Sequence, residues 1–187
     1  RLFLVMMESS GDRIQGGVLP LSLPFKSGIM RARFHPLDGQ LYVTGLKGWQ
    51  TAGAKDAALH RVRYTGRPLN LPVGLSARKT GIEVTFSDPL EPESAADAQN
   101  YAAEQWNYRW TKDYGSKDYS VAKPGLVGRD RVEIVSAKLS VDRKMVFLEI
   151  PGLSPVMQMS IKLRPKAADG EELRHEIFNT IHFLSEP

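Results

Sequence analysis

Residues 81–101 read GIEVTFSDPLEPESAADAQNY, and this stretch decides the fold of the chain. It begins with a strand-like run, continues through an Asp-Pro turn and a short acidic helical segment, and ends at Asn100-Tyr101. Downstream, residues 132–150 (VEIVSAKLSVDRKMVFLEI) read as two more strands around a Val-Asp-Arg-Lys turn. Short strands joined by turns predict a β-sandwich and give little indication of a catalytic site.

The same pattern of short apolar runs and turns extends through the second half of the chain. Strands are predicted there over 75–79, 81–87, 101–110, 132–139, 145–150, 157–163 and 177–184. Seven short strands of this kind are typical of an immunoglobulin-like (Ig-like) sandwich. A helical turn is expected over 92–100. The segment 111–131 has glycines and a proline but no apolar period, and is expected to be a long surface loop.

The first part of the chain reads as one antiparallel meander. An apolar run over 2–7 predicts a strand buried on both faces, and further strands are predicted over 29–34, 40–44 and 59–64. A meander of this size is typical of one β-propeller blade, which needs neighbouring blades to bury its two faces. The predicted fold class is therefore all-β, with a propeller-blade-like meander over 1–70 packed on an Ig-like sandwich over 71–187.

Composition limits the possible functions. The 187 residues are 42% hydrophobic, enough to bury a core, and the +4 charge comes from Lys and Arg interspersed with Asp and Glu. This pattern predicts a mixed, solvated surface rather than a nucleic-acid-binding patch. No apolar run reaches the roughly 18 residues of a membrane span. The chain has no cysteine, which excludes disulfides and thiolate chemistry. The opening RLFLVMMESS does not resemble a signal peptide, and we expect a piece of a longer protein.

The residues that usually carry catalysis or metal binding lack the necessary spacing. The four histidines, His35, His60, His175 and His182, form no metal-binding pair, and there is no G-x-S-x-G motif. We therefore predict no catalytic residue, metal site or cofactor. Two readings remain open for the acidic residues at 88, 91, 93 and 97: an oxygen-ligand calcium site, or a helix N-terminus that favours carboxylates.

An aromatic cluster is the one candidate binding feature. It comprises Tyr101, Trp106, Tyr108, Trp110, Tyr114 and Tyr119. On a continuous strand, residues 106, 108 and 110 would share one face, either as a stacking platform for sugars or as a packing surface. We assign Trp106 and Trp110 to packing and the loop residues Tyr114 and Tyr119 to ligand binding. Trp49, on a glycine-flanked loop, is a third candidate.

The second half of the chain resembles bacterial Ig-like domains of surface-layer proteins and adhesins. The resemblance rests on Phe86-Ser-Asp-Pro-Leu90, Asn100-Tyr101, Val135-Ser-Ala-Lys-Leu-Ser140 and Val146-Phe-Leu-Glu-Ile150. It implies an Ig-like sandwich with a structural or adhesive role.

The first part resembles the closing blade of secreted glucose/sorbosone dehydrogenase-like propeller proteins. The matching segments are 14–17, 25–28, 34–39, 41–43, 47–50 and 61–66, together with Tyr114-Gly-Ser116. The resemblance implies a periplasmic or extracellular, non-catalytic C-terminal module that binds polysaccharide or a c-type cytochrome domain. It also implies an alternative, a quinoprotein fragment in which Arg13, His35 or Trp49 completes an active site formed by upstream blades.

Overall fold

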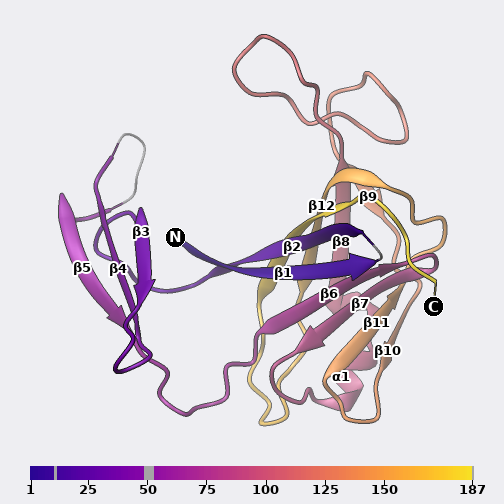
Figure 1. The fold of residues 1–187 in the computed structure, drawn as a ribbon. Coiled ribbons are helices and arrows are strands. Elements are labelled where there is room, and N and C mark those ends of the chain that lie inside the picture. The colour runs from indigo at the N-terminus through magenta and orange to yellow at the C-terminus, as the bar shows by residue number, and fades with distance from the viewer. Residues whose placement is uncertain (11, 49–52, 187) are drawn as a thin grey trace. The chain divides into compact units, whose positions relative to one another are not determined.

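Antiparallel strands make up nearly all of the regular structure. The structure is a computed structural model that describes residues 1–10, 12–48 and 53–186. Strands account for 48% and helices for 4%, and none of the sheets formed by these residues is closed, so the predicted all-β class is confirmed. The chain divides into two units, residues 1–3 with 20–68 and residues 4–19 with 69–187 (Figure 1).

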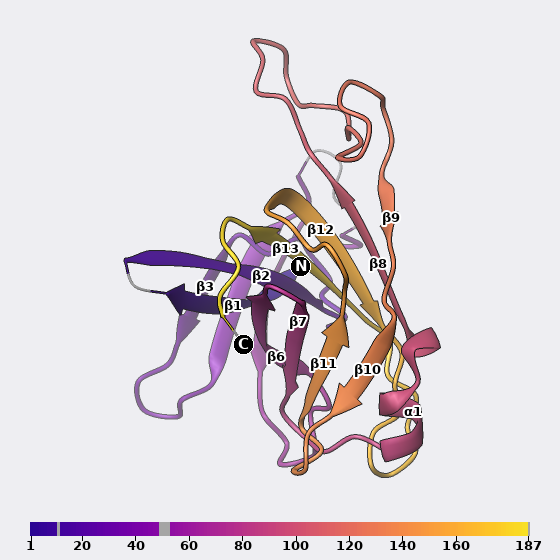
Figure 2. The ribbon, with the colours of Figure 1, turned by 90° about the vertical axis from the view of Figure 1, so that its right-hand side faces the viewer.

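The second unit contains two sheets. The larger has the order β1 (Leu2–Ser10), β2 (Arg13–Leu21), β13 (His175–Ile181), β12 (Val156–Leu163), β8 (Tyr101–Trp106) and β9 (Asp130–Val132). The smaller has the order β10 (Ser136–Leu139), β11 (Met145–Glu149), β7 (Gly81–Phe86) and β6 (Pro72–Arg78). Figure 2 shows β7, β11 and β10 running together on one side of this unit.

Alternating burial explains why these strands form two layers. In β7, Ile82 and Val84 are fully buried. In β13, Ile177, Asn179 and Ile181 are buried, while Phe178 and Thr180 are partly exposed. Because successive side chains of a strand point to opposite faces, each sheet presents one apolar face. Burying those two faces against each other gives the core of a β-sandwich-like fold.

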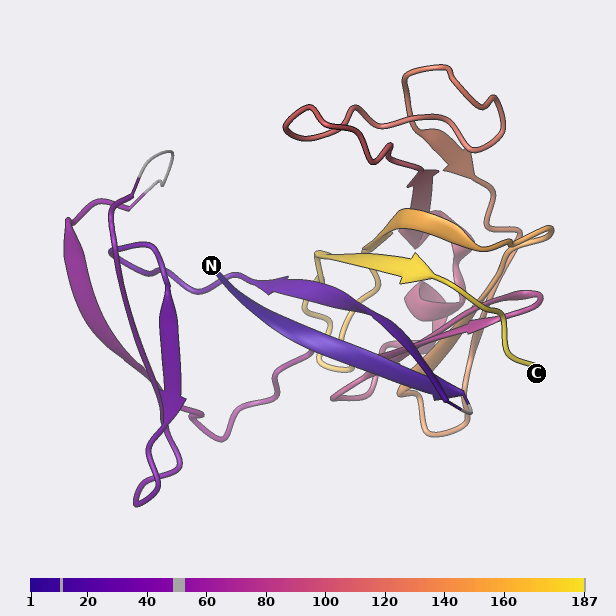
Figure 3. The same cartoon turned by 45° about the horizontal axis from the view of Figure 1, so that its top comes forward.

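The first strands join this sandwich rather than the meander. The sequence predicted one strand over 2–7, buried on both faces, followed by loops. Instead β1 and β2 are neighbours in the large sheet, seen as the indigo hairpin in Figure 3, and β2 pairs with β13. One face of the hairpin is exposed, since Val5 and Met7 are 62% and 76% exposed. Residues 4–19 therefore belong to the second unit, not to the predicted 1–70 domain.

Two glycines allow β2 to pair so closely with its neighbours. Gly17 lies opposite Asn179, and a Cβ at Gly17 would come within 2.9 Å of the Asn179 Cβ. A Cβ at Gly16 would lie 1.9 Å from the Met6 carbonyl oxygen, and the φ of Gly16 is +159°. The Gly16-Gly17 pair, which the sequence suggested was a loop, is therefore a close approach of three strands.

A buried polar network fixes the hairpin to the rest of the second unit. Glu8 and Gln15 are only 8% and 7% exposed. The Glu8 Oε2 accepts hydrogen bonds from Gln15 Nε2 at 2.7 Å and from the Ala77 amide of β6 at 3.0 Å. The Gln15 Oε1 accepts from the amides of His182 and Phe183, at 2.8 and 3.1 Å. The network thus links both sheets to the segment that follows β13.

The first unit contains the three-stranded sheet β3 (Arg31–Phe34), β4 (Leu41–Leu46) and β5 (Ala57–Val62). The segment before β3 covers part of one of its faces. The Lys26 amide donates to His60 Nε2 at 3.1 Å, and the rings of Phe25 and His60 lie 5.3 Å apart, edge to face. On the same face Val43 is completely buried. The strands are those that the sequence predicted, while their origin in a propeller blade stays a prediction.

The helical turn predicted over 92–100 is present as α1 (Pro92–Ala96) and the 3-10 turn η1 (Ala98–Asn100). Glu91 caps α1, and its carboxylate accepts hydrogen bonds from the amides of Glu93 and Ser94. Among the helices of the described residues, none has the length and apolarity of a membrane span.

Candidate functional site

The long connection between β8 and β9 is an ordered loop with two lobes. Figure 1 shows both lobes extending beyond the end of the sandwich. Asn107 and Tyr119 exchange two backbone hydrogen bonds of 2.8 Å, and this pairing closes residues 108–118 into one lobe, here called the aromatic lobe. Tyr119 also bridges to Val127, which closes the second lobe, residues 120–126.

Two arginines stabilise the base of the aromatic lobe, and each stacks on an aromatic ring. The guanidinium of Arg129 lies 3.7 Å from the centre of the Trp106 ring and pairs with Asp118 at 2.7 Å. The guanidinium of Arg109 lies 4.1 Å from the centre of the Tyr119 ring. Cation–π contacts of this kind contribute roughly 0.5–1 kcal/mol each at exposed sites, and here they tie the lobe to the end of β8.

Asp130 organises the second lobe. Its carboxylate accepts hydrogen bonds from the Val121 and Ala122 amides, at 2.6 and 2.9 Å, and from the Ser120 hydroxyl at 2.7 Å. These bonds lower the pKa of the Asp130 carboxyl below its ordinary value, and the bond from the Ala122 amide is the largest cause. The negative charge of Asp130 therefore stabilises the turn of the second lobe.

The aromatic lobe presents large rings to solvent. Trp110 is 95% exposed, Tyr114 is fully exposed and Tyr108 is 42% exposed. A shallow hollow of about 370 Å³ lies in this lobe, lined by Tyr108, Arg109, Trp110, Thr111, Asp113, Gly115 and Ser116. The Arg109 amide donates to Ser116 Oγ at 2.9 Å and so joins the two sides of the lobe. Rings and hydrogen-bonding groups therefore line one surface.

In the structure, the two residues assigned to packing differ from each other in exposure, and so do the two residues assigned to ligand binding. Tyr114 lies on the exposed surface of the lobe, and its role in ligand binding stays a prediction. Tyr119 is half-buried under Arg109 and belongs to the base of the lobe. Trp106 is 6% exposed, in agreement with packing. The assignment of Trp110 to packing was wrong, because β8 ends at Trp106, four residues earlier than predicted.

Trp49 lies outside the described residues. Arg13 and His35, the other two residues of the alternative quinoprotein reading, lie within the described residues. Arg13 is exposed at the start of β2, in the second unit. His35 lies in the turn after β3, in the first unit, where its Nδ1 is 3.3 Å from Asp38 Oδ1.

The acidic residues around α1 bind backbone amides. Asp88 Oδ2 accepts hydrogen bonds from the Leu69 and Asn70 amides and from the Ser87 hydroxyl, and the Ser87 bond is the largest cause of its lowered pKa. Glu91 caps α1, and Asp97 caps η1. This arrangement corresponds to the helix-terminus reading of the acidic residues. The described part of the chain has no group of three or more His, Cys, Asp or Glu residues placed to hold a metal ion.

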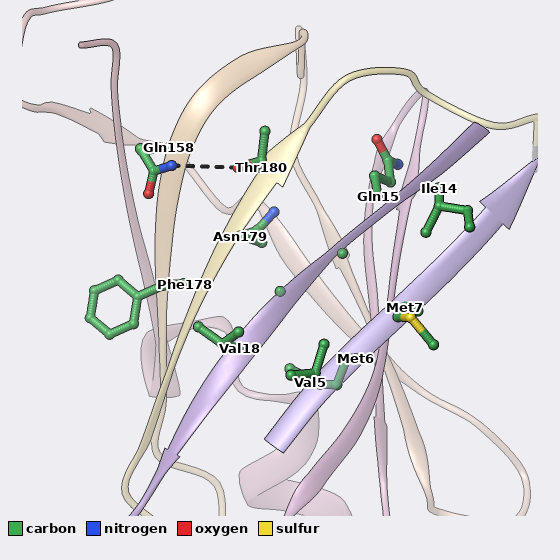
Figure 4. A pocket seen from close by; sticks show the side chains of 12 residues that line it. Val5, Met6, Met7, Ile14, Gln15, Val18, Gln158, Phe178, Asn179 and Thr180 are labelled. Carbon is green, nitrogen blue, oxygen red and sulfur yellow. Dashed lines mark hydrogen bonds between the residues drawn. The ribbon is translucent and has the colours of Figure 1, made fainter. Parts of the chain in front are cut away.

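A groove beside the hairpin was not predicted from the sequence. It has a volume of about 420 Å³ and lies along β1, β2 and β13. Figure 4 shows apolar side chains along it, namely Val5, Met7, Ile14, Val18 and Phe178. The Gly16-Gly17 pair in the middle of β2 was the available signal, because residues without side chains leave a depression on a sheet surface.

His175 gives a testable pH dependence. Its Nε2 lies 2.9 Å from the Asn70 carbonyl oxygen, and burial lowers its pKa below the ordinary 6.5. The unfolded chain then binds a proton at a higher pH than the folded chain does, so the free energy of unfolding should fall as the pH drops below about 6.5. Denaturant melts between pH 7 and 5.5 should show this fall, and His175→Gln should reduce it. Equal slopes for the two proteins would contradict the assignment.

Comparison with known proteins finds no matching family model, no significantly similar curated protein and no significantly similar solved structure.

Proposed function

We propose that this chain is a non-catalytic interaction module that binds polysaccharide through the aromatic lobe. The observation that carries the proposal is the exposure of Trp110 and Tyr114 on a loop whose base is held by the Arg129–Trp106 and Arg109–Tyr119 contacts. Exposed apolar groups that gather in one patch mark interaction sites, and their burial by a ligand is favourable.

The bracing of the lobe supports a recognition role. A mobile loop loses conformational entropy when it binds, whereas a loop already held in one conformation loses less. Flat amphipathic rings also provide contact area with few rotatable bonds. The side chains of Arg109, Thr111 and Asp113 line the same hollow and supply donors and acceptors for sugar hydroxyls.

The proposed setting follows from the resemblances of the sequence. The chain would be the C-terminal part of a larger secreted protein of the glucose/sorbosone dehydrogenase-like type, located in the periplasm or outside the cell. A c-type cytochrome domain of such a protein is then the other candidate partner for the lobe. Propeller blades and a CxxCH haem motif upstream in the natural precursor would support this setting.

A glycan array probed with the full chain tests the proposal. Trp110→Ala and Tyr114→Ala are each expected to weaken binding by about 2 kcal/mol, roughly 30-fold, if they are central contacts. Their unfolding free energies should stay within about 0.5 kcal/mol of the parent chain, because both side chains are exposed.

Leu126→Ala is the matched control, since Leu126 is an exposed apolar residue, 58% exposed, on the second lobe of the same connection. It should leave glycan binding unchanged. The proposal fails if the chain binds no glycan, or if the Trp110 and Tyr114 variants bind as well as the control. If the chain binds no glycan but captures a protein domain, and this capture is lost in Trp110→Ala, the ligand of the lobe is a protein and not a polysaccharide.

A further inference from the structure

The positive charge of the chain is concentrated in the first unit. Residues 1–3 and 20–68 contain nine Lys and Arg residues against two Asp, a net charge of +7. The remaining residues contain 16 Lys and Arg against 19 Asp and Glu, a net charge of −3. The modest overall charge of +4 therefore conceals a strongly basic unit, and a basic unit attracts anionic partners.

Three arginines of this unit share one face of the three-stranded sheet, here called the arginine face. Arg33 lies opposite Tyr42, and Tyr42 lies opposite Arg61, so these residues form one row across β3, β4 and β5. Arg31 lies two residues before Arg33 and thus on the same face. From strand spacings, the Cα atoms of Arg31 and Arg33 are about 7 Å apart and those of Arg33 and Arg61 about 10 Å apart.

The arginine face is open. The side chains of Arg31, Arg33 and Arg61 are exposed. On the opposite face the segment that contains Phe25 packs on His60, and only part of that face is covered, since Phe34 is 74% exposed. Arg63, which follows β5, is also exposed and adds a fourth cation beside the face.

These arginines have free binding capacity. Within the described residues, none of the four forms an ion pair with a carboxylate. Arg31 and Arg33 each donate one hydrogen bond to the carbonyl oxygen of the preceding residue. A guanidinium has five N–H groups in a planar fork that matches two oxygens of a carboxylate or sulfate. Most of the donors on this face are therefore available to a ligand.

Asp38, an acidic residue in the turn between β3 and β4, is already engaged. Asp38 accepts hydrogen bonds from the Gln40 amide at 2.9 Å and from the Tyr42 hydroxyl at 3.0 Å, and it lies beside His35. The Gln40 bond is the largest cause of the lowered pKa of Asp38. Asp38 therefore holds the end of the turn and fixes the Tyr42 ring in the middle of the row.

We propose that the arginine face binds an acidic polysaccharide, one that carries carboxylate or sulfate groups along its chain. The spaced guanidinium groups would each bind one anionic group. The Thr44 hydroxyl on the same face donates to the Ala58 carbonyl oxygen at 3.1 Å and can still accept from a sugar hydroxyl. The arginine face belongs to the first unit and the aromatic lobe to the second, and the inference stands whether or not the lobe binds glycan.

A nucleic acid fits the face less well. Single-stranded nucleic acids bind where basic side chains alternate with exposed aromatic rings on which the bases stack. Among its described residues, the arginine face carries a single ring, that of Tyr42, which is half-buried and held by Asp38. The face thus offers charge and hydroxyl groups but no stacking platform, and this combination suits a charged sugar chain.

Fluorescently labelled polygalacturonate titrated with the full chain tests the proposal, with neutral dextran as the uncharged comparison. We expect polygalacturonate binding that weakens with added salt, because exposed charges are screened. In the triple variant Arg31→Gln, Arg33→Gln, Arg61→Gln the affinity should fall about tenfold or more. The control triple variant Arg13→Gln, Arg131→Gln, Arg164→Gln removes the same charge from exposed positions of the second unit and should bind like the parent chain.

Several results would overturn the proposal. Absence of polygalacturonate binding would contradict it. An equal loss of affinity in the two triple variants would contradict it as well, because the loss would then depend only on the net charge of the chain. Tighter binding of a DNA oligonucleotide or of phosphatidylglycerol vesicles, with the same dependence on Arg31, Arg33 and Arg61, would assign the face to that other ligand. Circular dichroism melts of both triple variants establish that each remains folded.

Discussion

Replacement of Trp106 by alanine is expected to lower the free energy of unfolding of the second unit by about 3–5 kcal/mol. Trp106 is 6% exposed at the end of β8, so its removal leaves a cavity that the surrounding strands cannot fill completely. The variant also loses the stacking of Arg129, worth roughly 0.5–2 kcal/mol. Urea melts of the parent chain and the variant measure the difference.

Trp110→Ala is the control for this experiment. The same chemical change at a position that is 95% exposed should alter the unfolding free energy by no more than about 0.5 kcal/mol. The two tryptophans lie four residues apart and differ in their burial and in the Arg129 contact of Trp106. If Trp110→Ala were the more destabilising change, β8 would have to continue past Trp106, as the sequence had suggested.

Replacement of Gln15 by leucine should have the second-largest effect, a loss of about 2–4 kcal/mol of unfolding free energy. Leucine keeps the approximate volume of the side chain but removes the hydrogen bonds to Glu8 and to the His182 and Phe183 amides. Buried polar groups that lose their partners cost roughly 1–3 kcal/mol each, and several lose them here.

Gln158→Leu is the matched control for Gln15→Leu. The Gln158 side chain is only partly buried and makes one long hydrogen bond, 3.4 Å, to the Thr180 hydroxyl. Its replacement should cost less than about 1 kcal/mol. Similar melting curves for the two variants would mean that the network around Gln15 contributes little to the attachment of the hairpin.

The strands of the second half could be predicted because their apolar periods are strong and their turns are explicit. The predicted strands over 81–87, 145–150 and 157–163 differ from β7, β11 and β12 by one residue at one end. Glu91 and Pro92 marked the start of the helical turn, since a capping carboxylate followed by proline is a local signal. Local chemistry was sufficient for these elements.

Features that depend on distant partners could not be predicted. Gly16-Gly17 has the composition of a loop, and only the close approach of Asn179 explains its place in a strand. Trp110 continued an alternating pattern, but Asn107 pairs with Tyr119 and so ends the strand. The arginine face could not be predicted either. The register of β3, β4 and β5 brings together arginines that the sequence intersperses with acidic residues.

The pairing of β2 with β13 also constrains how the chain reaches its native state. Val18 lies opposite Phe178, its partner 160 residues later in the chain. At a translation rate of about 5–20 residues per second, the hairpin would leave the ribosome about 10–30 s before its partner strand is made. A lone hairpin is only marginally stable, and contacts between residues so far apart form slowly. The nascent hairpin is therefore expected to stay without its partner strand, with apolar side chains exposed, until β13 emerges.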